Sequence, residues 1–369
     1  MTGIHDDVKL NQALMVRRKV PALIHAECCT NEIKNEINLN HMRETMSEPS
    51  GINEPYLDPQ MRPILEKMLE RMAARTSMLE VTPEQMRVRA SEDLARWNQN
   101  PPSLPKVINT SVPGAFGPVD IRIYDPRGTG QPMPALIYFH GGGWIIGDLE
   151  TEDQSLRKLA LGSGVGIVSV KYALAPEHKF PEPVEDCVAV SRWLRTEGEG
   201  MGLDTNRFGL GGGSAGANLA MATALSLRDA GDNWVQFLQF FYGVFSSDTN
   251  TESYRQYGTG AYGLDKKAMD FFLSLYLNHS TEKAHPLVSP LMADLKGLPP
   301  VFLTIAGADP LRDDSRMMAD HLKRADVSVE AIEYPGVLHG FTLMADEVDA
   351  AKKAWDDAAS ALKQALGNA

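Results

Sequence analysis

Apolar positions recur at helical spacing in the first part of the chain, whereas later they gather in short β-rich runs separated by helical runs. Up to about residue 105 no strand pattern stands out. Apolar residues follow Pro63 every three or four positions, and Thr82 with Gln85 forms a capping box that predicts the start of a second helix. These amphipathic helices need a partner surface, and a proline-rich link over residues 101–105 ends the region.

Short β-rich runs alternate with helical runs from Lys106 onward. The predicted strands cover residues 121–124, 136–139, 166–171, 208–210, 237–244, 301–305 and 327–334. The predicted helices cover residues 151–161, 184–196, 215–229, 314–324 and 347–366. This alternation predicts an α/β fold in which a mostly parallel sheet has helices on both faces and active groups at the carboxyl ends of its strands.

The change of pattern predicts two regions. We interpret residues 1–105 as an N-terminal helical cap region with an extension, and residues 106–369 as the catalytic domain. Within the second region, residues 246–285 interrupt the alternation of strands and helices. They contain a stretch rich in Ser, Thr and Tyr and a predicted helix over 266–277. We therefore expect 246–285 to be an insertion that contributes to the cap.

Charge and composition exclude several classes of partner. The 369 residues include 36 Lys and Arg and 48 Asp and Glu, for a formal net charge of -12, so the chain lacks the positive field that attracts nucleic acid or anionic lipid. No run approaches the ~18 consecutive apolar residues that span a bilayer, and no apolar signal core is evident, so we expect no membrane insertion and a cytoplasmic location. Cys28, Cys29 and Cys187 are too few and too oddly spaced for a disulfide framework or a Cys-x-x-Cys metal site.

The segment from Gly212 to Gly216 spells GxSxG between a predicted strand and a predicted helix. This is the context of a nucleophile elbow, in which a serine sits on a sharp strand-to-helix turn. Glycine at Gly212 and Gly216 lets neighbouring backbone approach without a Cβ clash, so that the Ser214 hydroxyl is exposed. We therefore expect Ser214 to be a nucleophile.

The same glycines also fit a rival motif. Gly211, Gly213 and Gly216 satisfy GxGxxG, which is typical of dinucleotide-binding oxidoreductases. Such a site usually occupies the first strand-turn-helix unit and is followed about 20 residues later by an acidic residue that ends a strand. Here the motif lies in mid-chain, and Asp229 and Asp232 fall around a predicted helix end. The dinucleotide interpretation stays an alternative that explains fewer of the motifs.

A glycine run after the predicted strand 136–139 supplies a second motif. The run reads HGGGW and consists of His140, Gly141, Gly142, Gly143 and Trp144. Successive glycines let backbone N–H groups point into a pocket, where they join the N–H of Ala215 in stabilising a tetrahedral oxyanion, each donor contributing roughly 3 kcal/mol. A lone glycine run predicts only a flexible loop. Together with the elbow it predicts an oxyanion hole whose loop is braced by His140.

A general base and its orienting carboxylate are expected after the nucleophile, in the order Ser, Asp or Glu, His. Asp309 follows a predicted buried strand, and His339 follows the last predicted strand. Asp313 and Asp314 are rival carboxylates, but we expect them to begin the next helix, where acidic side chains favour the N-terminal dipole. Two further carboxylates are interpreted as structural, Glu177 and Asp186.

These motifs together give a resemblance to a known family. From about residue 136 to 341 the chain resembles the hormone-sensitive-lipase-like family (bacterial family IV) of α/β-hydrolase esterases. The motifs that support it are HGGGW at 140–144, YALAPEHKFP at 172–181, GGSAGAN at 212–218, DPLRD at 309–313 and HGF at 339–341. The resemblance implies an α/β-hydrolase fold with an eight-stranded, mostly parallel sheet under a helical cap.

The resemblance also implies a function and its residues. A member of this family is a carboxylesterase that hydrolyses short- to medium-chain acyl esters through a Ser-His-Asp triad and an acyl-enzyme intermediate, without metal or cofactor. Family members often form dimers through the catalytic domain, so a homodimer is a further expectation. The implied residues are the triad Ser214, Asp309 and His339, the oxyanion donors Gly142, Gly143 and Ala215, and the turn-shaping Gly141.

Two features depart from the family pattern. Gly213 stands before the nucleophile, where related esterases commonly have Asp or Thr, and residues 1–45 extend beyond the usual N-terminal cap. An alternative function follows from the plant gibberellin receptor, which resembles the family but has lost the catalytic histidine: the chain would then be a non-catalytic ligand-binding protein. The retained His339 favours an enzyme.

Overall fold

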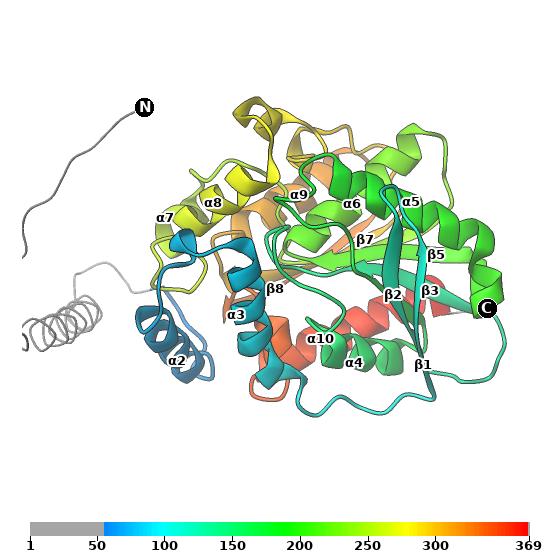
Figure 1. The fold of residues 1–369 in the computed structure, drawn as a ribbon, viewed down its shortest axis with the longest axis horizontal. Helices are drawn as coiled ribbons and strands as arrows, with labels where there is room; N and C mark the ends of the chain where they lie inside the picture. Colours follow the sequence, from blue (N-terminus) through cyan, green and yellow to red (C-terminus); the bar gives the residue numbers. More distant parts are fainter. Residues whose placement is uncertain (1–54, 368–369) are drawn as a thin grey trace, which may run out of the picture. The chain divides into compact units, whose positions relative to one another are not determined.

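A computed structural model of the protein describes residues 55–367, in which eight strands form one sheet (Figure 1). The strands are β1 Lys106–Pro113, β2 Pro118–Asp125, β3 Met133–Phe139, β4 Gly166–Val170, β5 Leu203–Gly213, β6 Val235–Phe241, β7 Val301–Ala308 and β8 Val329–Leu338. Along the sheet they follow the order β1-β2-β4-β3-β5-β6-β7-β8. β2 is antiparallel to β1 and β4, and the other neighbours are parallel. The eight-stranded, mostly parallel sheet implied by the resemblance is confirmed.

Helices precede the strands, connect them or follow the last one. They are α2 Arg62–Ala73, α3 Pro83–Ala95, α4 Asp153–Ser163, α5 Glu182–Glu197, α6 Ala215–Asp229, α7 Glu252–Tyr257, α8 Lys266–Tyr276, α9 Arg312–Arg324 and α10 Asp349–Leu362, with the short 3-10 turn η1 Met78–Glu80 between α2 and α3. The capping box predicted for α3 is confirmed. Thr82 Oγ1 accepts from the Gln85 N–H at 3.3 Å, and Gln85 Oε1 accepts from the Thr82 N–H at 3.0 Å.

One strand is not predicted by the apolar pattern. The seven predicted strands correspond to β2 to β8, whereas β1 lies at the edge of the sheet, pairs with β2 alone and buries only Val112. A strand with one neighbour and mostly exposed side chains lacks the continuous apolar run that marks central parallel strands. The short helix α7 is missed for a similar reason, because its six residues are too few to show a helical period.

The described residues belong to one compact unit. Cys187 is a buried free thiol within it. The N-terminal extension with Cys28 and Cys29 lies outside the described residues, and the boundary near residue 105 stays a prediction. Within residues 55–367, no helix combines the length and the apolar character needed to cross a membrane.

Alternate residues of the central strands face opposite layers of helices. In β3, Ile137 and Phe139 pack into the apolar layer that contains α5 and α6, while Leu136 and Tyr138 pack into the layer that contains α4 and α10 (Figure 1). Full burial of a side chain of this size contributes about 1.5–3 kcal/mol. Because both faces are covered, β3 is apolar along its whole length.

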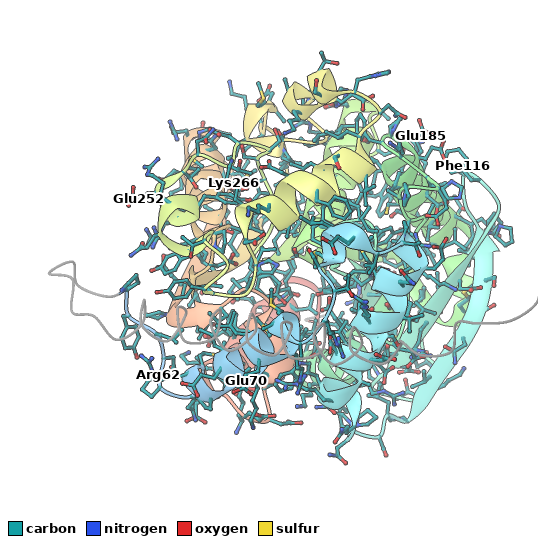
Figure 2. The ribbon with its side chains drawn as sticks, turned by 60° about the vertical axis from the view of Figure 1, so that its left-hand side comes forward. Arg62, Glu70, Phe116, Glu185, Glu252 and Lys266 are labelled. Atoms are coloured by element: carbon teal, nitrogen blue, oxygen red, sulfur yellow. The ribbon has the colours of Figure 1, made fainter. Side chains whose placement is uncertain are left out.

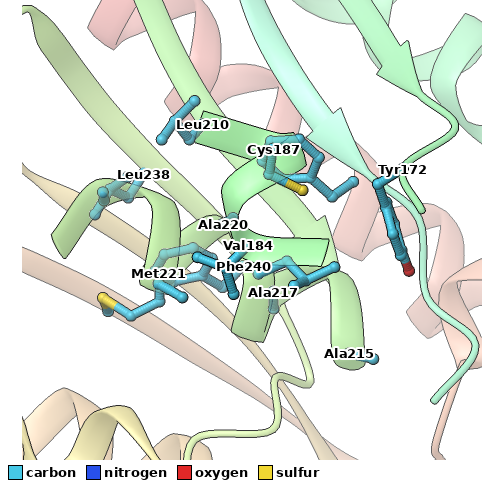
Figure 3. Close-up of a cluster of buried hydrophobic side chains, with 14 of the residues drawn as sticks. Tyr172, Val184, Cys187, Leu210, Ala215, Ala217, Ala220, Met221, Leu238 and Phe240 are labelled. Atoms are coloured by element: carbon cyan, nitrogen blue, oxygen red, sulfur yellow. The ribbon is translucent and has the colours of Figure 1, made fainter. Parts of the chain in front are cut away.

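Helix α6 lies at the centre of the first layer (Figure 3). Its small residues Ala217 and Ala220 share one buried cluster with Leu210 of β5 and Val184 of α5. Small side chains allow α6 to approach the sheet and α5 closely. Since α6 begins directly after Ser214, this packing fixes the backbone that presents the predicted nucleophile.

Two groups of helices correspond to the predicted cap. The first group, α2, η1 and α3, precedes β1, and the second, α7 and α8, lies between β6 and β7 within the predicted insertion 246–285. The groups meet where α8 packs against η1. Figure 2 shows them at one side of the molecule, with Glu70 on α2 and Lys266 on α8 labelled. The ring of Phe272 in α8 lies against Gly143, so the cap covers the carboxyl end of β3.

Candidate active site

The predicted nucleophile lies at the carboxyl end of β5, in the middle of the sheet. Ser214 follows β5 directly and has φ 55° and ψ -119°, a conformation that costs a non-glycine residue of order 1–3 kcal/mol. A Cβ at Gly212 would lie 2.4 Å from the carbonyl carbon of Gly216, and a Cβ at Gly216 would lie 2.0 Å from the carbonyl oxygen of Phe139. Only glycine fits at these two positions, so the sharp turn depends on backbone contacts.

Three side chains from three strand ends form a hydrogen-bonded chain. His339, which follows β8, has Nε2 2.9 Å from Ser214 Oγ and Nδ1 2.7 Å from Asp309 Oδ2. Because an ionised carboxylate only accepts, His339 Nδ1–H donates to Asp309, and Nε2 is left to accept from the Ser214 hydroxyl. The structure thus brings together the three residues that were singled out by their order in the sequence.

The two ends of this chain differ in exposure. Asp309 follows β7 and its side chain is fully buried, whereas the side chain of His339 is 17% exposed. Asp309 Oδ1 also accepts from the Leu311 N–H at 2.9 Å. The carboxylate therefore has a fixed orientation, while the imidazole reaches a partly open edge of the site.

Tyr242 supports His339 from the side. Its ring and the imidazole meet at an interplanar angle of 67° with 4.9 Å between ring centroids, and its hydroxyl shares a 2.7 Å hydrogen bond with Thr342 Oγ1. The apolar pattern includes Tyr242 in the strand predicted over 237–244, but β6 ends at Phe241. Nothing in the pattern marks the residue just beyond the strand as a neighbour of the histidine.

The rival carboxylates have other partners. Asp313 and Asp314 lie in the first turn of α9, as expected. Asp313 accepts from the Ser253 N–H at 2.7 Å, and Asp314 accepts from the Phe245 N–H at 3.0 Å. Burial raises the pKa of Asp314 to about 8. Among the contacts of the described residues, His339 is a partner of Asp309 and of neither rival.

Glu177 and Asp186 have structural contacts. Glu177 pairs with Arg87 of α3 at 2.6 Å, which ties the first cap group to the segment after β4. Asp186 accepts from the N–H groups of Ala115 and Ala173 at 3.0 and 3.1 Å. Both carboxylates therefore hold loops in place.

The glycine run after β3 forms a loop beside Ser214. Gly142 and Gly143 have φ 125° and 59°. A Cβ at Gly142 would lie 2.1 Å from a backbone oxygen, and a Cβ at Gly143 would lie 2.7 Å from the ring of Phe272. Among the residues that the structure describes, the N–H groups of Gly142, Gly143 and Ala215 have no hydrogen-bond partner, so they are free to donate to a bound oxygen.

His140 is buried under this loop. Its Nδ1–H donates to the Gly141 carbonyl oxygen at 2.8 Å, and its ring stacks on Tyr172 with 4.4 Å between centroids. The Tyr172 hydroxyl donates to the His140 carbonyl oxygen at 2.8 Å. Burial lowers the pKa of His140 to about 4, so the ring is neutral near neutral pH. His140 thus contributes shape rather than charge.

Glu152 reaches the same loop from the start of α4. Its buried carboxyl group accepts from the Tyr138 hydroxyl at 2.6 Å and from the Gly141 N–H at 3.2 Å. Burial raises the pKa of Glu152. Sequence reasoning missed this residue because an acidic residue at a helix start is an ordinary feature of exposed helices. Only the folded arrangement brings α4 against the end of β3.

A cavity of about 700 Å³ lies between α3 and the segment that follows the glycine loop. Its lining includes side chains of both charges, such as Arg87, Lys171 and Asp148, and does not include Ser214 or His339. Within residues 55–367, no group of three or more His, Cys, Asp or Glu residues is arranged to hold a metal ion.

Similarity to known proteins decides the family. A family model described as alpha/beta hydrolase fold matches residues 136–343. The chain belongs to the α/β-hydrolase family, in its hormone-sensitive-lipase-like branch. This hydrolase is 34% identical over 328 residues to Carboxylesterase NlhH of Mycobacterium tuberculosis, an alignment that covers 87% of this chain and 99% of the relative. It is also 34% identical over 249 residues to an acetyl esterase of Salmonella schwarzengrund, covering 66% and 76% of the two chains.

Solved structures agree with this family. An esterase from the archaeon Pyrobaculum calidifontis has a TM-score of 0.80 and 33% identity, covering 84% of this chain and 98% of the other. An ester hydrolase from the metagenome of Lake Arreo, complexed with a bipyridine phosphonate derivative, has a TM-score of 0.81 and 33% identity, covering 85% and 100%. The α/β-hydrolase described here is therefore a carboxylic-ester hydrolase.

Proposed function

We propose that this hydrolase is a carboxylesterase that acts on short- to medium-chain acyl esters through Ser214, His339 and Asp309 and an acyl-enzyme intermediate. The observation that supports the mechanism is the pair of hydrogen bonds on one imidazole, 2.9 Å from Nε2 to Ser214 Oγ and 2.7 Å from Nδ1 to Asp309 Oδ2. A base within hydrogen-bond distance of the hydroxyl, itself oriented by a third group, is what activation of a serine requires.

Acylation begins when Ser214 Oγ attacks the ester carbonyl carbon and its proton moves to His339 Nε2. Asp309 stabilises the imidazolium that forms. The carbonyl oxygen becomes an oxyanion and accepts hydrogen bonds from the glycine loop and Ala215, whose free N–H groups support this role. The bond between the acyl carbon and the alcohol oxygen then breaks, and the alcohol leaves with the proton from His339.

Deacylation reverses these steps with water in place of the alcohol. His339 removes a proton from water, and the water oxygen attacks the acyl carbon of the intermediate. The bond between the acyl carbon and Ser214 Oγ breaks, Ser214 regains a proton from His339, and the carboxylic acid is released.

The cap supports the proposed size of the acyl group. Phe272 packs directly on Gly143, one of the proposed oxyanion donors, so an aromatic wall stands close to the reacting carbonyl. Trp144, the residue after Gly143, is buried and stacks on the buried Tyr276 of α8 with 4.5 Å between ring centroids. One relative is named an acetyl esterase, which supports an ester of a short acid. In a chain-length series of aryl esters, a preference for long acyl chains contradicts this assignment.

Replacement of the nucleophile tests the mechanism. Ser214→Ala is expected to lower hydrolysis by about 10⁴-fold or more with little change in melting temperature, because the change removes one buried hydroxyl. An organophosphonate probe should label the wild type at Ser214 and leave the variant unlabelled. Hydrolysis retained by the purified variant contradicts the triad. A wild type that neither turns over esters nor reacts with the probe supports the ligand-binding alternative.

A further inference from the structure

The carboxyl group of Glu152 fills the space beside the residue that precedes the nucleophile. A Cβ built on Gly213 would lie 3.6 Å from Glu152 Oε1 and 3.3 Å from the Tyr138 hydroxyl oxygen. The φ of Gly213 lies outside the left-handed region, so the backbone itself does not require glycine there. A longer side chain at position 213 would instead meet the carboxyl group of Glu152.

The same carboxyl group joins β3 to the loop that carries the proposed oxyanion donors. Glu152 Oε2 accepts from the Tyr138 hydroxyl at 2.6 Å, and Oε1 accepts from the Gly141 N–H at 3.2 Å. Gly141 comes just before Gly142 and Gly143, so a fixed Gly141 peptide limits how the next two N–H groups can turn. Glu152 is 4% exposed, and water is therefore not available to replace either contact.

We propose that Glu152 is a positioning residue of the oxyanion loop, and that its carboxyl group occupies the place left open by Gly213 next to the nucleophile. The inference rests on the proposed function of Ser214. Glu152 acts through Gly141 rather than by touching the substrate. Related esterases commonly have Asp or Thr at the position of Gly213, so this chain puts a polar group into the same region from a different element, α4.

Charge agrees with this arrangement. Burial raises the pKa of Glu152, and the hydrogen bonds from the Tyr138 hydroxyl and the Gly141 N–H oppose that shift. A second carboxyl group on position 213 would stand at contact distance from the first, and two carboxyl groups that share a buried site oppose each other's ionisation. Glu152 and an acidic residue at position 213 should therefore be incompatible, and this incompatibility can be measured.

Two substitutions of Glu152 separate positioning from folding. Glu152→Gln retains an acceptor for the Gly141 N–H and a donor for the Tyr138 oxygen, so kcat should stay within about threefold of wild type. Glu152→Ala leaves both groups unpaired, and kcat should fall about tenfold while KM changes less than about twofold, since the loss is smaller than that of a direct oxyanion donor. The affinity for a trifluoromethyl ketone, which mimics the tetrahedral intermediate, should fall by the same factor as kcat.

A double-variant cycle tests the shared space. Gly213→Ala adds a methyl group whose nearest contacts are 3.3 Å or longer and should leave kcat near wild type. Gly213→Asp should lower kcat about tenfold in the wild type, because two carboxyl groups then compete. In the Glu152→Ala background, Gly213→Asp should raise kcat. Asp186→Ala is the control, because Asp186 is also a buried carboxyl group that accepts from two backbone N–H groups, and its loss should lower the melting temperature without changing kcat.

The outcomes distinguish this inference from the proposed function. A wild type that resists the phosphonate probe refutes the proposed function itself. If the probe labels Ser214, the proposed function holds, and two results would still overturn the role of Glu152. The first is a Glu152→Ala variant with the kcat and the ketone affinity of the wild type. The second is an equal effect of Gly213→Asp on kcat in the wild type and in Glu152→Ala. If Glu152→Ala does not fold, the same cycle in the Glu152→Gln background tests the role of Glu152. The inference predicts that Gly213→Asp lowers kcat less in Glu152→Gln than in the wild type.

Discussion

The carboxyl end of the sheet and the cap that covers it are built in different ways. At the sheet, backbone touches backbone: a single methyl group on Gly216 would collide with the Phe139 carbonyl oxygen at 2.0 Å. In the cap, α2 and α3 expose Met72 and Val88, and α8 meets the site through the ring of Phe272. In a closely packed region even one added methylene lowers the stability of the fold, whereas a contact between side chains can be repacked with a smaller loss of stability. We infer that the sheet edge determines the chemistry and that the cap determines which ester enters.

The largest effect is expected at Asp309, within the sheet edge. In Asp309→Asn the amide cannot stabilise the imidazolium and favours the wrong tautomer of His339, so kcat should fall about 10⁴-fold, the size of effect that this change has in a serine protease. Asp313→Asn is the matched control, four residues further on, where the carboxylate accepts from the Ser253 N–H. Steady-state kinetics should show a control kcat within about twofold of wild type. Equal losses in the two variants would falsify the assignment of Asp309.

The next effect concerns the backbone of the nucleophile turn. Gly216→Ala must displace the Phe139 or His140 carbonyl group and should lower the free energy of unfolding by about 3 kcal/mol or more, as well as activity. Gly200→Ala is the control, because a Cβ there has no neighbour within 4 Å. In urea denaturation the control should stay within about 0.5 kcal/mol of wild type. A Gly216→Ala variant as stable as the control contradicts the claim that this region has no spare volume.

The same difference explains which parts of the site the sequence predicts. The turn at Ser214 and the glycine loop are short motifs whose backbone requirements are local, so a few adjacent residues suffice to recognise them. The order of the chain and the strand ends then point to Asp309 and His339, because parallel strands bring their carboxyl ends to one edge.

The remaining parts depend on contacts between segments. Glu152 reaches Gly141 because α4 folds back on β3, and Phe272 reaches Gly143 because a helix of the later insertion covers the sheet edge. No local motif encodes either contact. β1 shows the same limit for the fold, since an edge strand with one buried residue has no apolar run to recognise.

A smaller effect is expected when the cap is changed. Phe272→Leu shortens the wall beside Gly143 and should shift the preference of the hydrolase toward longer acyl chains, by about tenfold in the ratio of kcat/KM for two esters that differ by several methylenes. Its kcat for the best ester should change less than that ratio. Phe271→Leu, the same substitution one residue earlier in α8, is the control. Identical acyl preferences in the two variants and the wild type contradict a selective role for the cap.

The last effect concerns the pH dependence of stability rather than activity, and it lies at the joint between sheet and insertion, where Asp314 Oδ2 accepts from the N–H groups of Phe245 and Ser246. Burial raises the pKa of Asp314 to about 8, so between about pH 4 and about pH 8 the folded chain holds a proton that the unfolded chain releases. The contribution of Asp314 to the free energy of unfolding is therefore complete below about pH 4 and is lost as the pH rises toward 8. Asp314→Asn does not titrate and retains the acceptor oxygen, so the decline of the melting temperature over this range should become shallower.

Asp313 provides a control of opposite sign for this pH dependence. Although partial burial opposes it, the Ser253 N–H and Arg312 favour the charged form of Asp313 and lower its pKa. Its contribution to stability is thus present above the ordinary pKa of an aspartate and is lost as the pH falls through the lowered value. Asp313→Asn should alter the acid side of the melting-temperature profile. Because the charge of Asp313 helps to raise the pKa of Asp314, this variant should also change the slope toward pH 8, but less than Asp314→Asn does. The contrary outcome is an Asp314→Asn melting-temperature profile that runs parallel to the wild type from about pH 4 to about pH 8. It would show that the Asp314 carboxyl group is ionised in the folded chain and that water reaches the joint between sheet and insertion.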